Sequence, residues 1–180
     1  MANNRSGLIV NISSAGGLRY LFNIPYGVGK QALDRMSADM ALELKASLVN
    51  IFPPKNVCVV SIWPGAVRTE LITNLLNTPQ AAMSDEHVSV FREGETPEYP
   101  GKAVVALACD DRRMEKTGRI LITADMGNEY GFRDIDGRDP PNMRSLSFLL
   151  SHSGYKQTAE LIPSWVKVPG WLLWGATSRL

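Results

Sequence analysis

The stretch Leu8-Ile9-Val10-Asn11-Ile12-Ser13-Ser14 decides the fold class, because it is a short β-branched run that ends in small polar residues. Such a run is typical of a buried strand. A second run, Val57 to Trp63, stops at Pro64-Gly65, and a third is predicted over Gly118 to Thr123. Strands that alternate with helices indicate βαβ units, so the sequence predicts an α/β fold with a parallel sheet.

Helical patterns separate these strands. From Tyr26 to about Leu48 the apolar residues follow the spacing of one helix face. A second helix is predicted over Gly101 to Cys109, and residues 70–98 are expected to connect the elements, with a helical patch at Leu71 to Leu76. Three strands are few for such a core, so we expect a sheet truncated on its amino-terminal side, with an open edge that favours association.

The character of the chain changes after about Tyr130, where a polar turn is followed by a tail with its own composition. We therefore predict two parts, a domain over residues 1–130 and an extension over residues 131–180. The tail gathers Trp165, Trp171 and Trp174 close to Lys167. This pattern suits a membrane interface, an oligomer contact or packing against the domain, and the three alternatives stay open.

The composition limits the classes of protein to which this chain can belong. The 180 residues are 44% hydrophobic and 21% charged, as in an ordinary globular protein. Nineteen basic residues against 18 acidic ones leave no field that argues for nucleic acid. Cys58 and Cys109 lie in apolar runs without metal-binding spacing, so we expect buried structural thiols, a reducing compartment and no metal site. No run reaches the roughly 18 apolar residues that a membrane span requires.

Tyr26 and Lys30 carry the chemical signal. Because they are four residues apart on a predicted helix, they share one face. A nearby ammonium stabilises a phenolate, which makes Tyr26 a candidate acid or base. Ser13 or Ser14, at the end of the preceding strand, could hold the oxygen of a substrate.

These features together, in this order, resemble the short-chain dehydrogenase/reductase family. The family pattern is a strand-ending serine, then Tyr-x-x-x-Lys about a dozen residues on, then Pro-Gly-x-x-x-Thr. It is matched by Ser13/Ser14, by Tyr26 with Lys30, and by residues 64–69. The resemblance implies a Rossmann-like, three-layer α/β fold. It also implies hydride transfer between a nicotinamide cofactor and a carbonyl or alcohol of a small molecule.

The resemblance also implies roles for individual residues. Tyr26 would donate or accept the proton, and Lys30 would assist it and bind the ribose next to the nicotinamide. The serine would polarise the carbonyl. Residues after the second strand would line the nicotinamide and its carboxamide, namely Pro64, Gly65, Val67 and Thr69. The implied cofactor is NADP or NAD, with NADP slightly favoured.

Two family rules disagree on which serine acts. The usual distance of 13 residues before the tyrosine selects Ser13, whereas the usual Ser-x-x-Gly selects Ser14 with Gly17. We favour Ser14 as the one that points at Tyr26, because successive residues of a strand face opposite ways.

Several family features are absent from the 180 residues. There is no Thr-Gly-x-x-x-Gly-x-Gly phosphate loop, no residue that selects NAD or NADP, and no counterpart of the catalytic asparagine. We therefore expect the carboxyl-terminal part of such an oxidoreductase. The alternative is an inactive truncated chain that acts as an interaction module. The expected location is intracellular, in the cytoplasm or on the surface of endoplasmic reticulum or mitochondrial membranes, with a homo-oligomer or a peripheral membrane contact.

Overall fold

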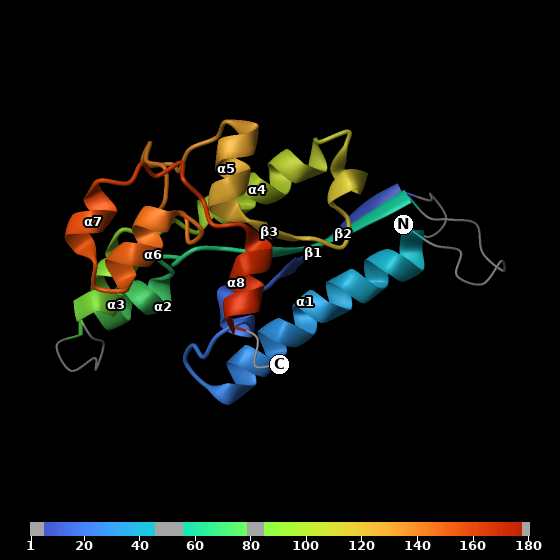
Figure 1. The fold of residues 1–180 in the computed structure, drawn as a ribbon. Helices are drawn as coiled ribbons and strands as arrows, with labels where there is room; N and C mark the ends of the chain where they lie inside the picture. The colour runs from blue at the N-terminus through green and yellow to red at the C-terminus, as the bar shows by residue number, and fades with distance from the viewer. Residues whose placement is uncertain (1–5, 46–55, 79–84, 178–180) are drawn as a thin grey trace. The chain divides into compact units, whose positions relative to one another are not determined.

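The computed structural model of this chain describes residues 6–45, 56–78 and 85–177 (Figure 1). They form two compact units, which are treated separately. Unit 1 comprises Met1–Pro64 and Glu98–Phe132, and unit 2 comprises Gly65–Pro97 and Arg133–Leu180. The predicted end of the first helix, near Leu48, lies outside the described residues.

Unit 1 is built on a parallel sheet of three strands in the order β1-β2-β3. They are β1 (Ser6–Ile12), β2 (Asn56–Trp63) and β3 (Ile120–Ile122). The register runs from Ser6 opposite Asn56 to Ile12 opposite Ile62, and β3 pairs with the last three residues of β2. Because β2 is central, every residue from Val57 to Trp63 is buried. The predicted parallel α/β fold is confirmed.

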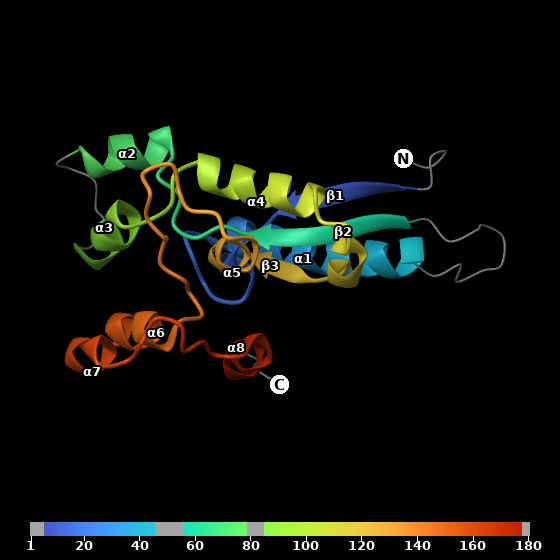
Figure 2. The same ribbon diagram turned by 90° about the horizontal axis from the view of Figure 1, so that it is seen from above.

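Helices cover both faces of the sheet (Figures 1 and 2). Alternate residues of a strand point to opposite faces, and the two faces of β2 enter different cores. Cys58, Val60 and Ile62 pack against α4 (Glu98–Ala108) and α5 (Thr123–Tyr130). Val57 and Val59 pack against α1 (Ile24–Lys45). The result is the expected Rossmann-like arrangement of helix, sheet and helix.

Unit 1 differs from the sequence predictions at the end of its third strand and at one cysteine. The third strand ends at Ile122, and Thr123 begins α5, a helix that the sequence did not predict. This helix packs so closely that a side chain on Gly127 would collide with the hydroxyl of Tyr99. Cys58 is buried, but Cys109 is exposed because it follows the last turn of α4, so its predicted burial is wrong.

Unit 2 contains short helices joined by loops. The first is α2 (Glu70–Leu76), which coincides with the predicted helical patch, and the second is α3 (Asp85–Arg92). The remaining helices are α6 (Leu146–His152), α7 (Lys156–Glu160) and α8 (Gly170–Thr177). An isolated antiparallel bridge joins Ser145 to Lys167. Within the described ranges, no helix is long and apolar enough to cross a membrane.

Candidate active site

The candidate site in unit 1 begins at the first turn of α1. The side-chain Oδ1 of Asn23 accepts a hydrogen bond from the backbone N–H of Tyr26 at 2.9 Å, as a helix-capping residue does. Just before it, Phe22 has a positive φ of 61°, which turns the chain into the helix. The ring of Phe22 then meets the ring of Tyr26 edge to face, with centroids 5.0 Å apart. The position of Tyr26 is therefore determined by contacts with the residues just before it, Phe22 and Asn23.

The loop after β1 supplies the other wall of this site. Ala15–Gly17 forms a short 3₁₀ turn directly after Ser14. A Cβ atom on Gly16 would lie only 2.5 Å from Cε1 of Tyr26, so the phenol ring rests against bare backbone. Gly16 is thus the position where the absence of a side chain makes room for the tyrosine.

Lys30 links the helix to the strand. Its Nζ donates a hydrogen bond to the carbonyl oxygen of Ile12, the last residue of β1, at 2.9 Å. The same Nζ lies 5.6 Å from the centroid of the Tyr26 ring. The positive charge is therefore held between the carboxyl end of the strand and the phenol.

The two serines have different surroundings. Ser13 is 2% exposed, and its Oγ donates to the carbonyl oxygen of Lys30 at 2.9 Å. Its backbone N–H donates to Ile62, which extends the sheet by one bond. The Oγ of Ser14 accepts from the N–H of Gly16 at 3.1 Å, and its own O–H donates to no atom in the described part of the chain. Of these two serines, Ser14 is the one whose hydroxyl proton has no acceptor among the described residues.

The residues predicted to line the nicotinamide divide between the units. Pro64 ends unit 1, whereas Gly65, Val67 and Thr69 belong to unit 2. Val67 forms an isolated parallel bridge with Glu95, and the N–H of Val67 itself has no partner among the described residues. The Oγ1 of Thr69 accepts from the N–H of Ile72 at 3.3 Å and so caps α2.

Two buried acidic residues near these segments were missed from the sequence. Asp34 is 5% exposed and accepts hydrogen bonds from the indole of Trp63, and Glu95 is 1% exposed and bonds to Gly65. Asp34 had a readable signal, because it lies four residues after Lys30 and therefore on the same helix face. Glu95 had none, since no periodic pattern surrounds it.

Comparison with known proteins shows which protein family this chain resembles. Residues 1–80 match the family model described as short chain dehydrogenase. The resemblance to the short-chain dehydrogenase/reductase family that the motifs predicted is therefore confirmed.

Particular relatives follow from the same comparison. The chain is 42% identical over 177 residues to the human protein Dehydrogenase/reductase SDR family member 1, and 39% identical over 171 residues to the mouse protein of that name. These alignments cover 96% and 93% of this chain but 54% and 52% of the relatives. The chain thus spans about half the length of the curated relatives it matches.

A solved structure agrees with these relatives. The structure of ElxO with NADP bound has a TM-score of 0.52 and 25% sequence identity to this chain. The match covers 68% of this chain and 47% of that one.

Proposed function

We propose that this chain supplies the proton-transfer residues of an NAD(P)-dependent oxidoreductase that interconverts a carbonyl and an alcohol on a small molecule. One observation carries the proposal. The ammonium of Lys30 is hydrogen-bonded to the end of β1 and lies 5.6 Å from the ring centroid of Tyr26. The same ring packs against the loop that contains Ser14, whose hydroxyl proton has no acceptor among the described residues. An acid, a cation and a hydrogen-bond donor are the groups that carbonyl reduction needs.

Each residue has a distinct task in the proposed reaction. In reduction, Tyr26 gives its phenolic proton to the carbonyl oxygen. Lys30 stabilises the resulting phenolate by its charge, and Ser14 donates a hydrogen bond to the same carbonyl oxygen. Ser13 holds the backbone of Lys30 in place through its buried hydroxyl. In alcohol oxidation the same groups act in reverse.

The residues present fit a nicotinamide cofactor. The amide N–H of Val67 is free among the described residues, and a free backbone donor suits a carboxamide oxygen. From the family pattern, we propose that Lys30 and Tyr26 bind the ribose and that Pro64, Gly65 and Thr69 line the nicotinamide. When bound, the cofactor supplies or accepts the hydride. The NADP complex of ElxO supports a nicotinamide cofactor, and of the two forms we propose NADP ahead of NAD.

Cofactor binding is the first test. The purified chain is titrated with NADPH and with NADH while nicotinamide fluorescence is followed. We expect saturable binding that Lys30→Ala weakens and that Lys45→Ala, an exposed lysine at the end of the same helix, leaves unchanged. No binding of either cofactor up to millimolar concentration would refute the proposal for this chain.

Turnover is the second test. With a panel of carbonyl substrates, Tyr26→Phe should lower kcat by about 10²- to 10⁴-fold, the usual contribution of a general acid. Tyr155→Phe, a 63% exposed tyrosine, is the matched control and should retain full activity. Retained turnover in Tyr26→Phe, with the circular dichroism spectrum unchanged, would remove Tyr26 from its assigned role.

A second candidate function is contact with another molecule through the tail. Trp165 and Trp171 are 76% and 73% exposed, and Trp174 and Leu172 are also exposed on α8. Exposed aromatic side chains in one segment are typical of contact surfaces. Sedimentation of the chain alone and with anionic vesicles tests this function. Loss of self-association or of vesicle binding in the Trp165→Ser/Trp171→Ser double variant supports it, and a monomer that ignores vesicles refutes it.

A further inference from the structure

One residue holds the segment that follows β2. The Oε1 of Glu95 accepts a hydrogen bond from the N–H of Gly65 at 2.9 Å. The backbone N–H of Glu95 donates to the carbonyl of Ala66, and its carbonyl accepts from the N–H of Arg68, each at 2.9 Å. The side chain and the backbone of Glu95 therefore clamp residues 65–68 at three points, Gly65, Ala66 and Arg68.

The burial of Glu95 shows that this contact is an integral part of unit 2. The residue is 1% exposed, and a carboxylate is costly to bury unless it accepts hydrogen bonds. Gly94 brings the clamp close, because a Cβ atom at this position would collide with the carbonyl of Ala66. The two backbones approach at a distance that only glycine permits.

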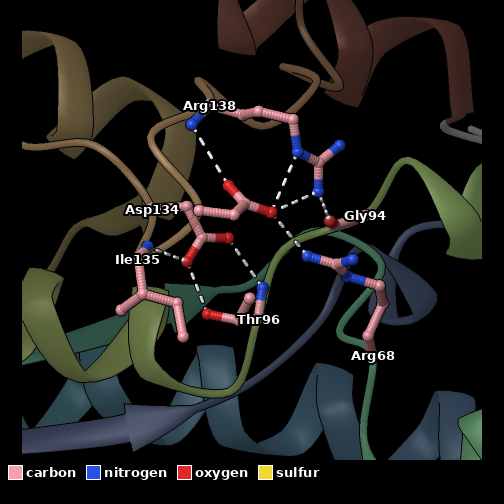
Figure 3. Close-up of polar contacts among 7 residues, drawn as sticks. Arg68, Gly94, Thr96, Asp134, Ile135 and Arg138 are labelled. Carbon is pink, nitrogen blue, oxygen red and sulfur yellow. Dashed lines mark hydrogen bonds and ion pairs between the residues drawn. The ribbon is translucent and has the colours of Figure 1, made fainter.

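The turn at residues 134–138 contacts both segments of the clamp, at Thr96 and at Arg68 (Figure 3). The carboxylate of Asp134 accepts from both the N–H and the hydroxyl of Thr96, the residue after Glu95. The Nη2 of Arg68 pairs with Asp136 at 2.8 Å, and Arg138 bonds to the same carboxylate. Residues 65–68 are thus fixed to a second part of the same unit.

The bridge between Glu95 and Val67 determines which backbone groups of residues 65–68 are left to bind a ligand. In a parallel bridge, the partner bonds to the residues on either side of the central one, which here are Ala66 and Arg68. The N–H of Val67 points away from Glu95 and stays unpaired among the described residues. An amide held on both sides loses little conformational freedom when it binds a ligand.

We propose that Glu95 is a positioning residue that presents the Val67 amide to the carboxamide oxygen of the nicotinamide. This inference rests on the proposed function. Glu95 does not touch the ligand but fixes the donor that does. The proposed acceptor is the carboxamide oxygen, which one free backbone N–H can satisfy with a single hydrogen bond.

Two variants separate the hydrogen bond from the rest of the side chain. Glu95→Gln keeps an oxygen that can accept from Gly65, whereas Glu95→Ala removes it. Glu93→Ala, an exposed glutamate two residues earlier, controls for the loss of a negative charge. Protection of the α6 amides in hydrogen exchange shows whether unit 2 of each variant, which contains Glu95, is folded.

The first readout is hydrogen exchange at the Gly65 and Arg68 amides, measured by NMR without cofactor. Loss of one hydrogen bond should speed exchange at Gly65 by about tenfold in Glu95→Ala. Glu95→Gln and Glu93→Ala should exchange like the unchanged protein. Unaltered exchange at Gly65 in a folded Glu95→Ala chain would overturn the clamp.

The second readout separates binding from chemistry. In Glu95→Ala the Kd for NADPH should rise by about tenfold while kcat at saturating cofactor changes less than twofold, and Glu95→Gln should restore most of the affinity. Normal affinity in Glu95→Ala overturns the role of Glu95 alone. An unchanged protein that binds no cofactor overturns the proposed function itself, so the two failures are distinguishable.

Discussion

The indole Nε1 of Trp63 lies 3.0 and 3.1 Å from the two carboxylate oxygens of Asp34. Both residues are buried, at 3% and 5% exposure. Trp63 is the last residue of β2, and Asp34 lies on α1 one turn after Lys30. Their hydrogen bonds therefore connect the helix that carries Tyr26 to the strand that ends before Pro64. Because both residues belong to unit 1, these hydrogen bonds help to hold α1 in place against β2 within that unit.

Removal of the indole donor should destabilise unit 1. Trp63→Phe leaves the buried carboxylate of Asp34 without this partner, and the expected loss is about 1–3 kcal/mol of the free energy of unfolding, plus a contribution from lost packing. Urea denaturation followed by circular dichroism measures it. Trp174→Phe, at 41% exposure, is the control. Equal stability of the two variants would show that the indole bond contributes nothing.

The serine pair should separate stability from catalysis. Ser13→Ala removes a buried hydroxyl that bonds to Lys30, so we expect about 1 kcal/mol lower stability and a nearly unchanged kcat. Ser14→Ala should lower kcat by about 10- to 10³-fold with little effect on stability, because its proton would stabilise the developing oxyanion. Thermal melts and initial rates on both variants provide the check. The reverse pattern would assign the catalytic role to Ser13.

A glycine pair should show how closely the tyrosine is seated. Gly16→Ala places a methyl group 2.5 Å from Cε1 of Tyr26, so the ring must move and turnover should fall at least tenfold. Gly29→Ala meets open space on α1 and should raise stability by roughly 1 kcal/mol through helix propensity. Initial rates and urea midpoints compare the two. Full activity in Gly16→Ala would mean that the tyrosine does not need this contact.

The pH dependence of stability should reflect a cluster behind α4. Hydrogen bonds from Tyr130 and then Lys116 lower the pKa of Asp110 to about 2. Burial, and then the hydrogen bond to Asp110, raises the pKa of Tyr130 to about 12. The hydrogen bond to Glu129 is the largest of the effects that raise the pKa of Lys116.

The signs of these shifts define two pH windows. The contribution of ionised Asp110 is complete above its unfolded pKa of about 4 and is lost as the pH falls toward 2. The contribution of protonated Tyr130 is complete below about pH 10 and is lost as the pH rises through about 12. Because the pKa of Lys116 is also raised, the contribution of its protonated form is likewise lost only on the alkaline side. Urea unfolding across the pH range should therefore show an acid slope that Asp110→Asn flattens and an alkaline slope that Tyr130→Phe flattens. Asp39→Asn, in an exposed ion pair on α1, should leave both slopes unchanged.

Local sequence predicted the elements that carry strong periodic signals. The β-branched runs of β1 and β2 appear within a few residues of their predicted bounds, and α1 begins at Ile24, close to its predicted start at Tyr26. The helix α5 was missed because it begins with a β-branched threonine and contains Gly127, both poor helix formers. Its stability comes from burial of Met126 and from the close packing of Gly127 on Tyr99, which are tertiary contacts.

In the candidate site, too, local spacing could be predicted from the sequence but tertiary contacts could not. The spacing of Tyr26 and Lys30 predicted a shared helix face, and the structure places both on α1 with Ser14 in the adjoining loop. Their catalytic roles stay predictions. Helix spacing alone could have placed Asp34 on the face of Lys30, but it could not have given its partner Trp63, which is about thirty residues distant in sequence. Glu95 could not be assigned at all, because its partner Gly65 is equally distant and no local pattern marks it.

The register of the sheet has a consequence for how unit 1 assembles. Ser6 pairs with Asn56 and Ser61 pairs with Ile120, so each strand pairing joins positions fifty or more residues apart. No hairpin links neighbouring strands, and each loop must close before a strand bond can form, which makes folding slow compared with a helical bundle of this size. During that interval the apolar surface of β2 is open to intermolecular contact, so refolding yield should fall steeply as protein concentration rises.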